Sequence, residues 1–227
     1  MLYTKEAVRD NIRNRDGKRV FFLGKGDQLT WEARDFLNGE KIAILPASEA
    51  KPERYRLLGG GFMEEKPEHM THLNGDYLVP KTHPRILLRG MVDTLEAELL
   101  LCCFDSTGEI RGQLEEALRF ARNLLRYEVL EEPVKEMTLG GMDEAALRAR
   151  SHRPQDYYGQ PHFMPEPTDG KLLLQVNRAR CAARAAELQA VAAFSDRRED
   201  LLRGFNRLSS FLYLIMIQLK CREKTGK

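Results

Sequence analysis

Apolar residues recur at intervals of three and four from Glu109 to Leu130, and this period constrains the fold more than any other feature of the chain. Side chains spaced in this way lie along one side of an α-helix. The apolar positions of this stretch are Ile110, Leu114, Ala117, Leu118, Ala121 and Leu125. Similar patterns predict helices at Pro84–Cys103, Asp143–Arg150, Lys171–Phe194 and Arg197–Cys221. The chain is therefore expected to be mainly α, with its long helices packed as a bundle.

The N-terminal part has a different pattern and predicts a small α/β unit. Its expected elements are a helix at Tyr3–Arg13, a strand at Val20–Leu23, a helix from Thr30 to Gly39 and a strand at Lys41–Leu45. Prolines and three consecutive glycines follow without any helical period. The expected organisation is an α/β unit at 1–45, a linker at 46–63 and a helical domain at 64–221.

Composition excludes several classes of function. The chain has 227 residues, of which 42% are hydrophobic and 31% charged, with a net charge of only +2. No block of Lys and Arg is large enough to predict nucleic-acid binding. The longest apolar run, Phe211–Ile217, is too short to cross a membrane, and the N-terminus lacks the apolar region of a secretory signal. Four scattered cysteines without a CxxC pair indicate reduced thiols, and so a cytoplasmic protein.

Polar residues interrupt helix stripes that are otherwise suited to burial. They are Asp93 in the helix after Pro84, Arg180, Arg184 and Glu187 in the helix from Lys171, and Asn206 and Ser209 in the last helix. Buried charges are costly unless paired, and the four charged residues sum to zero, so they could form a purely structural ion-pair network. They could equally line a pocket for an anionic ligand, because guanidinium groups bind phosphate through paired hydrogen bonds. Periodicity alone leaves both interpretations open.

Two other features are weaker evidence for a binding site. The triplet Gly59-Gly60-Gly61 is not followed by the Gly-Lys-Ser/Thr of a phosphate-binding loop. The histidines at 69, 72 and 83 lack the cysteine or carboxylate partners of a metal site, so no metal ligands are predicted.

Three segments, in the same order, resemble PduO-type ATP:corrinoid adenosyltransferases. VPKTHPRILLRGMVDTLEAEL (79–99) resembles the family's K-x-D-P-R-x-x-x-x-G-x-V-D-E-L-N segment. RARCAARAAE (178–187) resembles its A-R-T-x-x-R-R-A-E helix, and FNRLSSFLYLIMI (205–217) its L-N-R-L-S-D-x-L-F helix. Lys66-Pro67 with Thr71-His72-Leu73 further resembles the KPxxxTHL motif of the EutT branch, the ethanolamine-utilisation type, so the likeness extends over nearly the whole chain.

The resemblance implies transfer of the adenosyl group of ATP to the cobalt of cob(I)alamin, within a cobalamin adenosyltransferase-like helical bundle. ATP, accompanied by Mg²⁺, would lie between subunits of a homo-oligomer, either a dimer or a trimer. Asp93 matches the aspartate that pairs with an arginine across the subunit interface, and Arg180 matches that arginine. Arg184 and Glu187 match further site positions of the same helix, and Asn206 matches the asparagine of the last helix.

The resemblance also implies residues outside these helices. The PduO-type phosphate segment T-R-x-G-D-x-G is absent, and Lys66, Thr71 and His72 are expected in its place, with Lys81 at the lysine of the first motif. The family makes Co(I) accessible by displacing the lower axial ligand of cobalt with apolar residues. Phe163 or Met164 is expected to do so here.

The H-x11-C-C-x2-C metal cluster of many EutT proteins is missing, because no cysteine precedes Cys102, and a variant that needs only Mg²⁺ is expected. The implied partner is ethanolamine ammonia-lyase, and the implied location is the cytoplasm or a bacterial microcompartment. The alternatives are a non-catalytic carrier or sensor of adenosylcobalamin or ATP, and a helical interaction protein whose ion pairs are structural.

Overall fold

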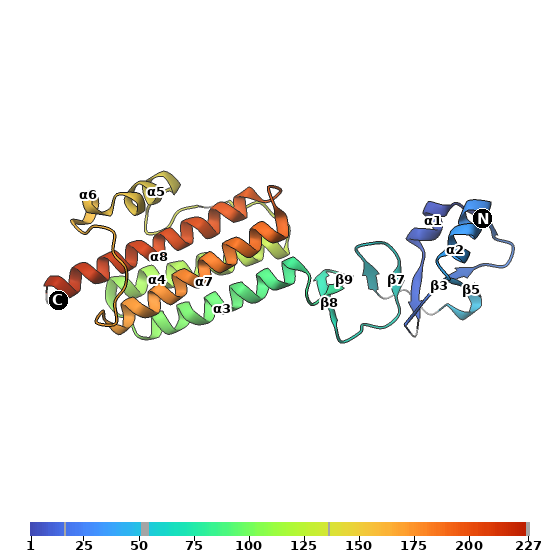
Figure 1. Cartoon of the computed structure of the whole chain (residues 1–227), viewed down its shortest axis with the longest axis horizontal. Coiled ribbons are helices and arrows are strands. Elements are labelled where there is room, and N and C mark those ends of the chain that lie inside the picture. The colour runs from blue at the N-terminus through green and yellow to red at the C-terminus, as the bar shows by residue number, and fades with distance from the viewer. Residues whose placement is uncertain (16, 51–54, 136, 226–227) are drawn as a thin grey trace. The chain divides into compact units, whose positions relative to one another are not determined.

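The computed structural model of the chain describes residues 1–15, 17–50, 55–135 and 137–225. It contains two compact units, Met1–His83 and Pro84–Lys227 (Figure 1). Each unit has its own cluster of buried apolar side chains. The division at 1–45, 46–63 and 64–221 that the sequence suggests stays a prediction.

The second unit is helical, as predicted. Its helices are α3 (Pro84–Phe104), α4 (Gly108–Val129), α5 (Glu144–His152), α6 (Pro154–Tyr158), α7 (Lys171–Phe194) and α8 (Glu199–Thr225). The four long helices match their expected positions to within a few residues at each end. The bundle that the periodicity predicts is therefore confirmed.

Four helix contacts build this bundle: α3 with α7, α7 with α8, α3 with α4, and α4 with α8 (Figure 1). The apolar run of α8 lies at its centre, and Phe211, Leu212 and Ile215 have no exposed surface. Gly204 lets α8 approach α4 closely, because a Cβ atom at this position would lie only 2.5 Å from Leu124 Cδ2. Burial of this apolar surface is the main source of the unit's stability.

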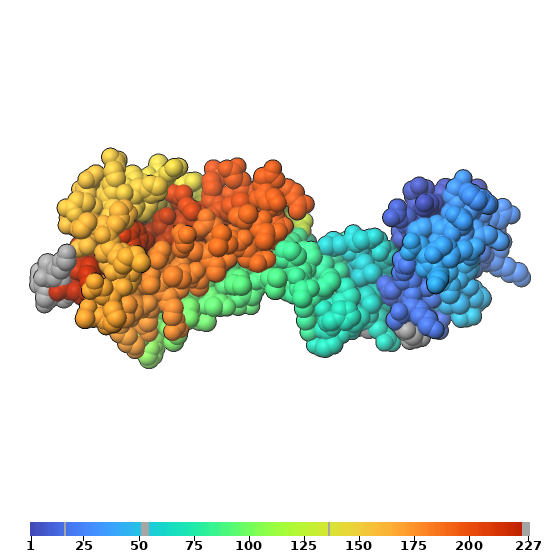
Figure 2. All heavy atoms as spheres, viewed as in Figure 1, coloured from blue at the N-terminus to red at the C-terminus, as the bar shows by residue number. Residues whose placement is uncertain are grey.

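The two short helices pack on α8 outside this bundle. The Asp143 carboxylate caps α5 by accepting a hydrogen bond from the Ala146 backbone N–H at 2.7 Å. Pro154 opens α6, and Gly159 closes it with a φ of +65°. No helix is predicted from the sequence between Arg150 and Lys171, so α6 adds to the predicted elements. Figure 2 shows atoms of α8, in red, between the segment 151–170, in yellow, and α7, in orange.

The first unit is a mixed sheet with two helices. Its elements are β1 (Leu2–Tyr3), α1 (Lys5–Asp10), β2 (Arg13–Arg15), β3 (Lys18–Leu23), β4 (Gln28–Leu29), α2 (Trp31–Gly39), β5 (Ala43–Pro46), the 3-10 turn η1 (Ala47–Glu49), β6 (Tyr55–Leu57), β7 (Phe62–Met63), β8 (Met70–Asn74) and β9 (Tyr77–Pro80). The larger sheet has the order β5-β3-β2-β7-β6-β9-β8, and β1 pairs with β4.

Part of this unit follows the sequence expectation. The Thr30 hydroxyl caps α2 by accepting the Ala33 N–H at 3.2 Å, and α2 ends at Gly39 as expected. The first helix is shorter than predicted, because Arg13 belongs to β2. Strands β6 to β9 are not predicted from the sequence, including β6 and β7 inside the expected linker, because strands of two to five residues are too short to show a period of two.

None of the described helices combines the length and apolar content that crossing a membrane requires.

Candidate active site

The stripe of α7 that faces the bundle interior has alanines along its middle, between Val176 and Phe194. Ala179, Ala183, Ala186 and Ala190 have no exposed surface. Arg180 and Glu187 lie beside this stripe and are half-buried, whereas Arg184 is exposed. The expectation that all three charged residues lie on the core-facing stripe is therefore wrong for a single chain. Positions one residue apart differ by about 100° around the helix axis, and the alanines offered a second stripe that the sequence analysis did not choose.

Asp93 on α3 likewise lies off the buried face of its helix. The buried stripe of α3 includes Leu88, Val92, Leu95 and Leu99, and Asp93 lies outside it with its side chain exposed. Among the described residues, no ion pair joins Asp93 to Arg180 or Arg184. A structural ion-pair network among these residues, one of the two interpretations that periodicity leaves open, is thus not seen within one chain among the described residues.

On α8 the polar residues do interrupt the buried face. Ser209 is only 6% exposed, and its hydroxyl donates to the Asn206 carbonyl at 2.9 Å. The Asn206 side chain is half-buried and donates from Nδ2 to Glu187 Oε1 at 2.8 Å. The amide oxygen of Asn206 accepts a hydrogen bond from Arg207. Both ends of the amide are therefore engaged.

Two polar contacts join α7 to α8 at matching intervals. Glu187 contacts Asn206, and the Arg180 guanidinium lies over the Tyr213 ring, 5.9 Å from its centroid. On α7, Glu187 lies seven positions after Arg180, and on α8, Tyr213 lies seven positions after Asn206. Seven positions are about two turns, so the two residues of each helix occupy one face of it. The helices run antiparallel, so these faces meet along their line of contact. Arg180 is also oriented by Asn177, whose Oδ1 accepts from Nε at 3.2 Å and from Nη2 at 3.1 Å.

Residues 159–170 pass over α8 beside this row of contacts. Tyr213 Oη lies 3.0 Å from His162 Nδ1 and accepts the Phe163 N–H at 3.4 Å. Phe163 is half-buried and packs on the bundle core, whereas Met164 is 84% exposed. The structure thus distinguishes Phe163 from Met164, which the sequence leaves as alternatives: Phe163 packs on the core, and Met164 does not. Tyr213 is not among the site residues predicted from the sequence, although the seven-residue interval from Asn206 is a signal for it.

The remaining expected residues belong to the unit Met1–His83. Lys66 lines a pocket of about 260 Å³ together with Arg15 and Asn14. Thr71 and His72 lie on β8, and His72 Nδ1 is 3.1 Å from the Gly75 carbonyl oxygen.

Lys81 pairs with Glu68 at 2.7 Å, and this contact lowers the pKa of the Glu68 carboxyl. Among the described residues, no group of three or more His, Cys, Asp or Glu side chains is arranged to hold a metal ion.

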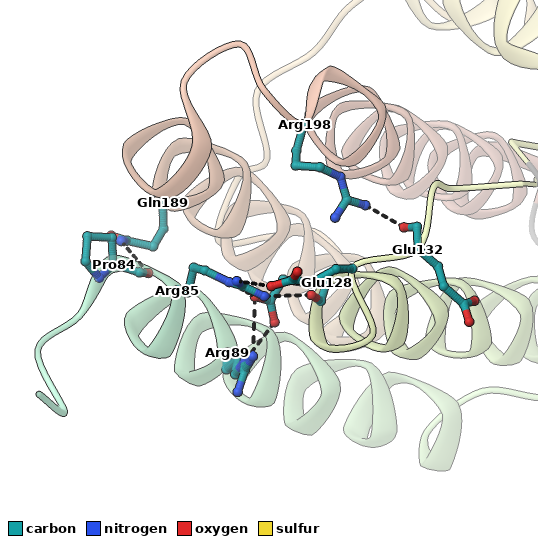
Figure 3. Close-up of polar contacts among 8 residues, drawn as sticks. Pro84, Arg85, Arg89, Glu128, Glu132, Gln189 and Arg198 are labelled. Atoms are coloured by element: carbon teal, nitrogen blue, oxygen red, sulfur yellow. Dashed lines mark hydrogen bonds and ion pairs between the residues drawn. The ribbon is translucent and has the colours of Figure 1, made fainter. Parts of the chain in front are cut away.

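A buried ion cluster fixes one end of the bundle, and the sequence analysis did not predict it. The Glu128 side chain, 1% exposed, accepts from Arg85 Nε at 2.5 Å and from Arg89 Nε at 2.7 Å (Figure 3). Arg85 also bonds the Glu128 carbonyl at 2.9 Å and Glu131 at 2.6 Å. Burial lowers the pKa of Arg85, but the hydrogen bonds that Arg85 donates to Glu131 and Glu128 outweigh it, so the pKa is raised. The cluster joins the start of α3 to the end of α4. Its sequence signal is a glutamate that continues the buried face of α4.

Residues 62–219, which include all four long helices almost to the end of α8, match the family model for cobalamin adenosyltransferases. The chain belongs to the cobalamin adenosyltransferase family. It is therefore a member of a family of transferases, as the three sequence motifs implied. The matched segment contains Asp93, Arg180, Arg184, Glu187 and Asn206.

Individual members of this family agree with the match. The chain is 29% identical over 178 residues to the corrinoid adenosyltransferase EutT of Salmonella typhimurium, covering 76% of this chain and 67% of that relative. The EutT of Escherichia coli strain K12 is 28% identical over the same length. The corrinoid adenosyltransferase PduO of Salmonella typhimurium is 31% identical over 144 residues, or 60% of this chain and 43% of PduO.

A solved structure shares the adenosyltransferase fold. A variant of the PduO-type ATP:corrinoid adenosyltransferase from Lactobacillus reuteri, complexed with cobalamin and ATP, has a TM-score of 0.54 and 18% identity. The likeness covers 69% of this chain and 89% of that one. At this identity the likeness concerns the fold, and it agrees with the predicted helical bundle.

Proposed function

We propose that this protein transfers the 5′-deoxyadenosyl group of ATP to the cobalt of cob(I)alamin, forming adenosylcobalamin. In this reaction the electron pair of Co(I) attacks the ribose C5′ atom, and the C5′–O bond breaks. The bonding electrons leave with the triphosphate, and cobalt becomes formally Co(III). The observation that carries the proposal is the family match over residues 62–219, which spans the helices bearing Arg180 and Asn206.

The side chains on α7 and α8 suit this chemistry. The corrinoid itself is the nucleophile, so the protein has to position the reactants and stabilise the charge of the leaving group. Arg180 uses Nε and Nη2 on Asn177, and a guanidinium has further N–H donors that phosphate oxygens can accept. Arg184, exposed one turn further along α7, adds a second positive charge. Mg²⁺ would be held by the triphosphate, since it binds phosphate oxygens strongly.

Asn206 and Glu187 hold the other end of the proposed site. Their hydrogen bond fixes α8 against α7 two turns away from Arg180. We assign to these two residues the placement of the nucleoside, which offers hydroxyl and amine groups to an amide and a carboxylate. Lys66, Thr71, His72 and Lys81 are proposed to take part in phosphate binding. The place of Lys66, Thr71 and His72 in the KPxxxTHL motif of the EutT branch, and of Lys81 in the first PduO-type motif, supports this.

The active site is proposed to form between subunits, with Asp93 of one subunit paired to Arg180 of another. The exposure of Asp93 supports this, because a single chain gives this side chain no ion pair among the described residues. Apolar side chains are also exposed on the same two helices: Leu87 and Met91 on α3, and Leu188 and Val191 on α7. Exposed apolar groups that gather on neighbouring helices are typical of an interface.

The likeness to the EutT relatives supports a place in ethanolamine utilisation, with ethanolamine ammonia-lyase as the consumer of the product. A cytoplasmic location, with or without a microcompartment, is part of the same proposal. The direct check is to supply the protein with apo-ethanolamine ammonia-lyase, corrinoid, reductant and ATP, and to follow acetaldehyde formation.

A spectroscopic assay tests the transferase activity itself. The protein is mixed with ATP, Mg²⁺ and chemically reduced cob(I)alamin. Loss of the Co(I) absorption together with a light-sensitive alkylcobalamin product is expected. Binding of ligands without conversion would instead identify a carrier or sensor, and no response would identify a structural protein. Arg180→Ala should abolish conversion while Arg203→Ala, an exposed arginine of α8, should not.

A further inference from the structure

The hydroxyl group of Tyr213 joins a polar network whose directions are fixed. His162 Nε2 lies 3.1 Å from the His152 carbonyl oxygen, which can only accept, so Nε2 carries the proton. In the neutral ring, Nδ1 is then an acceptor, and the Tyr213 hydroxyl donates to it across 3.0 Å. The Tyr213 oxygen in turn accepts the Phe163 N–H at 3.4 Å. Each of these groups has a partner, and the network holds one conformation of the backbone at residues 162 and 163.

The ring of Tyr213 makes a second set of contacts. It is stacked with His162 at 5.7 Å between centroids and with Phe163 at 6.2 Å. The guanidinium of Arg180 lies over the ring at 5.9 Å. Cations and aromatic rings attract one another at such distances. Tyr213 therefore contacts both Arg180 and the segment that carries Phe163.

A further anchor holds the same segment two turns along α8. Lys220 pairs with the buried Asp169 carboxylate and lies 5.8 Å from the centroid of the Phe163 ring. Asp169 Oδ2 also accepts the Glu166 N–H at 2.8 Å. Phe163 is thus held by two residues of α8 that lie seven positions apart on one helix face.

We propose that Tyr213 is a positioning residue that sets Phe163 relative to Arg180. The inference rests on the proposed function, in which Arg180 binds phosphates, and on the expectation from the family resemblance that Phe163 displaces the lower axial ligand of cobalt. Displacement requires an apolar ring at a defined distance from the corrin plane, and an error of about 1 Å at such a site can cost about 100-fold in rate. The Tyr213 hydroxyl supplies that precision through backbone and histidine contacts. The Tyr213 ring contacts both Phe163 and Arg180, and so connects Phe163 to the residue that binds the nucleotide.

The test separates ligand displacement from adenosyl transfer. The protein is loaded with Mg·ATP and cob(II)alamin, and the four-coordinate fraction is measured by electron paramagnetic resonance and visible absorption. In parallel, conversion is measured from cob(I)alamin that has been reduced chemically, which bypasses displacement. Tyr213→Phe retains the ring, so it should lower the four-coordinate signal by at least about 10-fold while the conversion of Co(I) stays within about 3-fold of the parent.

Two further variants complete the design. His162→Ala removes the acceptor of the Tyr213 hydroxyl and should show the same selective loss. Tyr157→Phe removes an exposed hydroxyl of α6 and should change neither readout. An unchanged four-coordinate signal in Tyr213→Phe, or equal losses in both readouts, would overturn the positioning role. A parent protein that fails to convert Co(I) would overturn the proposed function, and the positioning role with it.

Discussion

Asn206 donates a hydrogen bond to Glu187 across 2.8 Å, and this contact lies two helical turns from the point where Tyr213 meets Arg180. The α7–α8 hairpin thus carries its polar side chains as pairs in register, although its centre packs through alanines and large apolar residues. The pairs place an arginine at one end and an amide with a carboxylate at the other.

Removal of the amide at one end should affect activity more than stability. In Asn206→Ala, Glu187 loses its donor, and we expect conversion of cob(I)alamin to fall about 100-fold because the nucleoside is misplaced. A hydrogen bond to a charged group contributes about 1.5–3 kcal/mol, so the melting temperature should drop by only several degrees. Asn123→Ala on the exposed side of α4 is the control. Full activity in Asn206→Ala would contradict the assignment.

Charge reversal tests the subunit interface. Asp93→Arg would set like charges against Arg180 of the neighbouring subunit, and such contacts cost several kcal/mol. We expect the oligomer to dissociate at concentrations at least about 10-fold above those of the parent. The double variant Asp93→Arg with Arg180→Asp should restore assembly, measured by light scattering after size exclusion, but not conversion. Asp35→Arg on α2 controls for the charge change, and an oligomer that is indifferent to Asp93→Arg would rule out the pairing.

The buried cluster at the start of α3 should be important for stability. Glu128→Gln removes the buried carboxylate that Arg85 and Arg89 share, although Arg85 keeps its ion pair with Glu131. Breaking such a pair costs about 3–5 kcal/mol, which corresponds to a fall of about 10 °C in melting temperature. Glu131→Gln, at a carboxylate that is 55% exposed, should cost far less. Similar melting temperatures for the two variants would show that burial does not determine the effect.

The anchor at Asp169 should depend on pH. The hydrogen bond from Lys220, with the Glu166 N–H, holds the pKa of Asp169 below its ordinary value. A carboxyl with a lowered folded-state pKa stabilises the fold above the unfolded pKa, and this contribution is lost as the pH falls through the folded value. Asp169→Asn should therefore melt below the parent at pH 7, and the difference should shrink below about pH 4. A difference that stays constant across this range would exclude the ion pair as its cause.

The four cysteines should react at different rates. Burial raises the pKa of Cys102 to about 12 and also raises that of Cys103, so neither forms thiolate near neutral pH. Cys181 is exposed on α7. Native protein treated with a thiol reagent at pH 8 should be labelled first at Cys181, as peptide mass spectrometry can show, and labelling of Cys102 should appear only after denaturation. Early labelling of Cys102 would mean that the α3 end of the bundle opens.

The sequence predicts the helices better than it predicts their faces. Pro84–Cys103 and Lys171–Phe194 contain many periodic residues, so their ends are found within a residue or two. The choice of face in α7 depends on whether Ala183 or Arg184 turns inward, and alanine is compatible with both the interior and the surface. Only the docking of α7 against its neighbours decides between them.

The candidate site is predicted in part for the same reason. The motifs identify Arg180, Glu187 and Asn206, because each of these residues is part of a short continuous segment of sequence. The contact of Arg180 with Tyr213 depends on the phase in which two helices meet, and no single segment encodes that phase. The clustering of Arg85 around Glu128 is likewise a property of α3 packed on α4.

The row of alanines on α7 divides the helix into two sides with different freedom to vary. Methyl groups leave no space for larger side chains, so sequence drift at Ala183 or Ala186 would push whole helices apart. Within a single chain, the outward side, with Arg184 and Leu188, meets no such packing limit. A designer can therefore alter ligand preference or subunit number from that side of α7 while the interior of the bundle stays as it is.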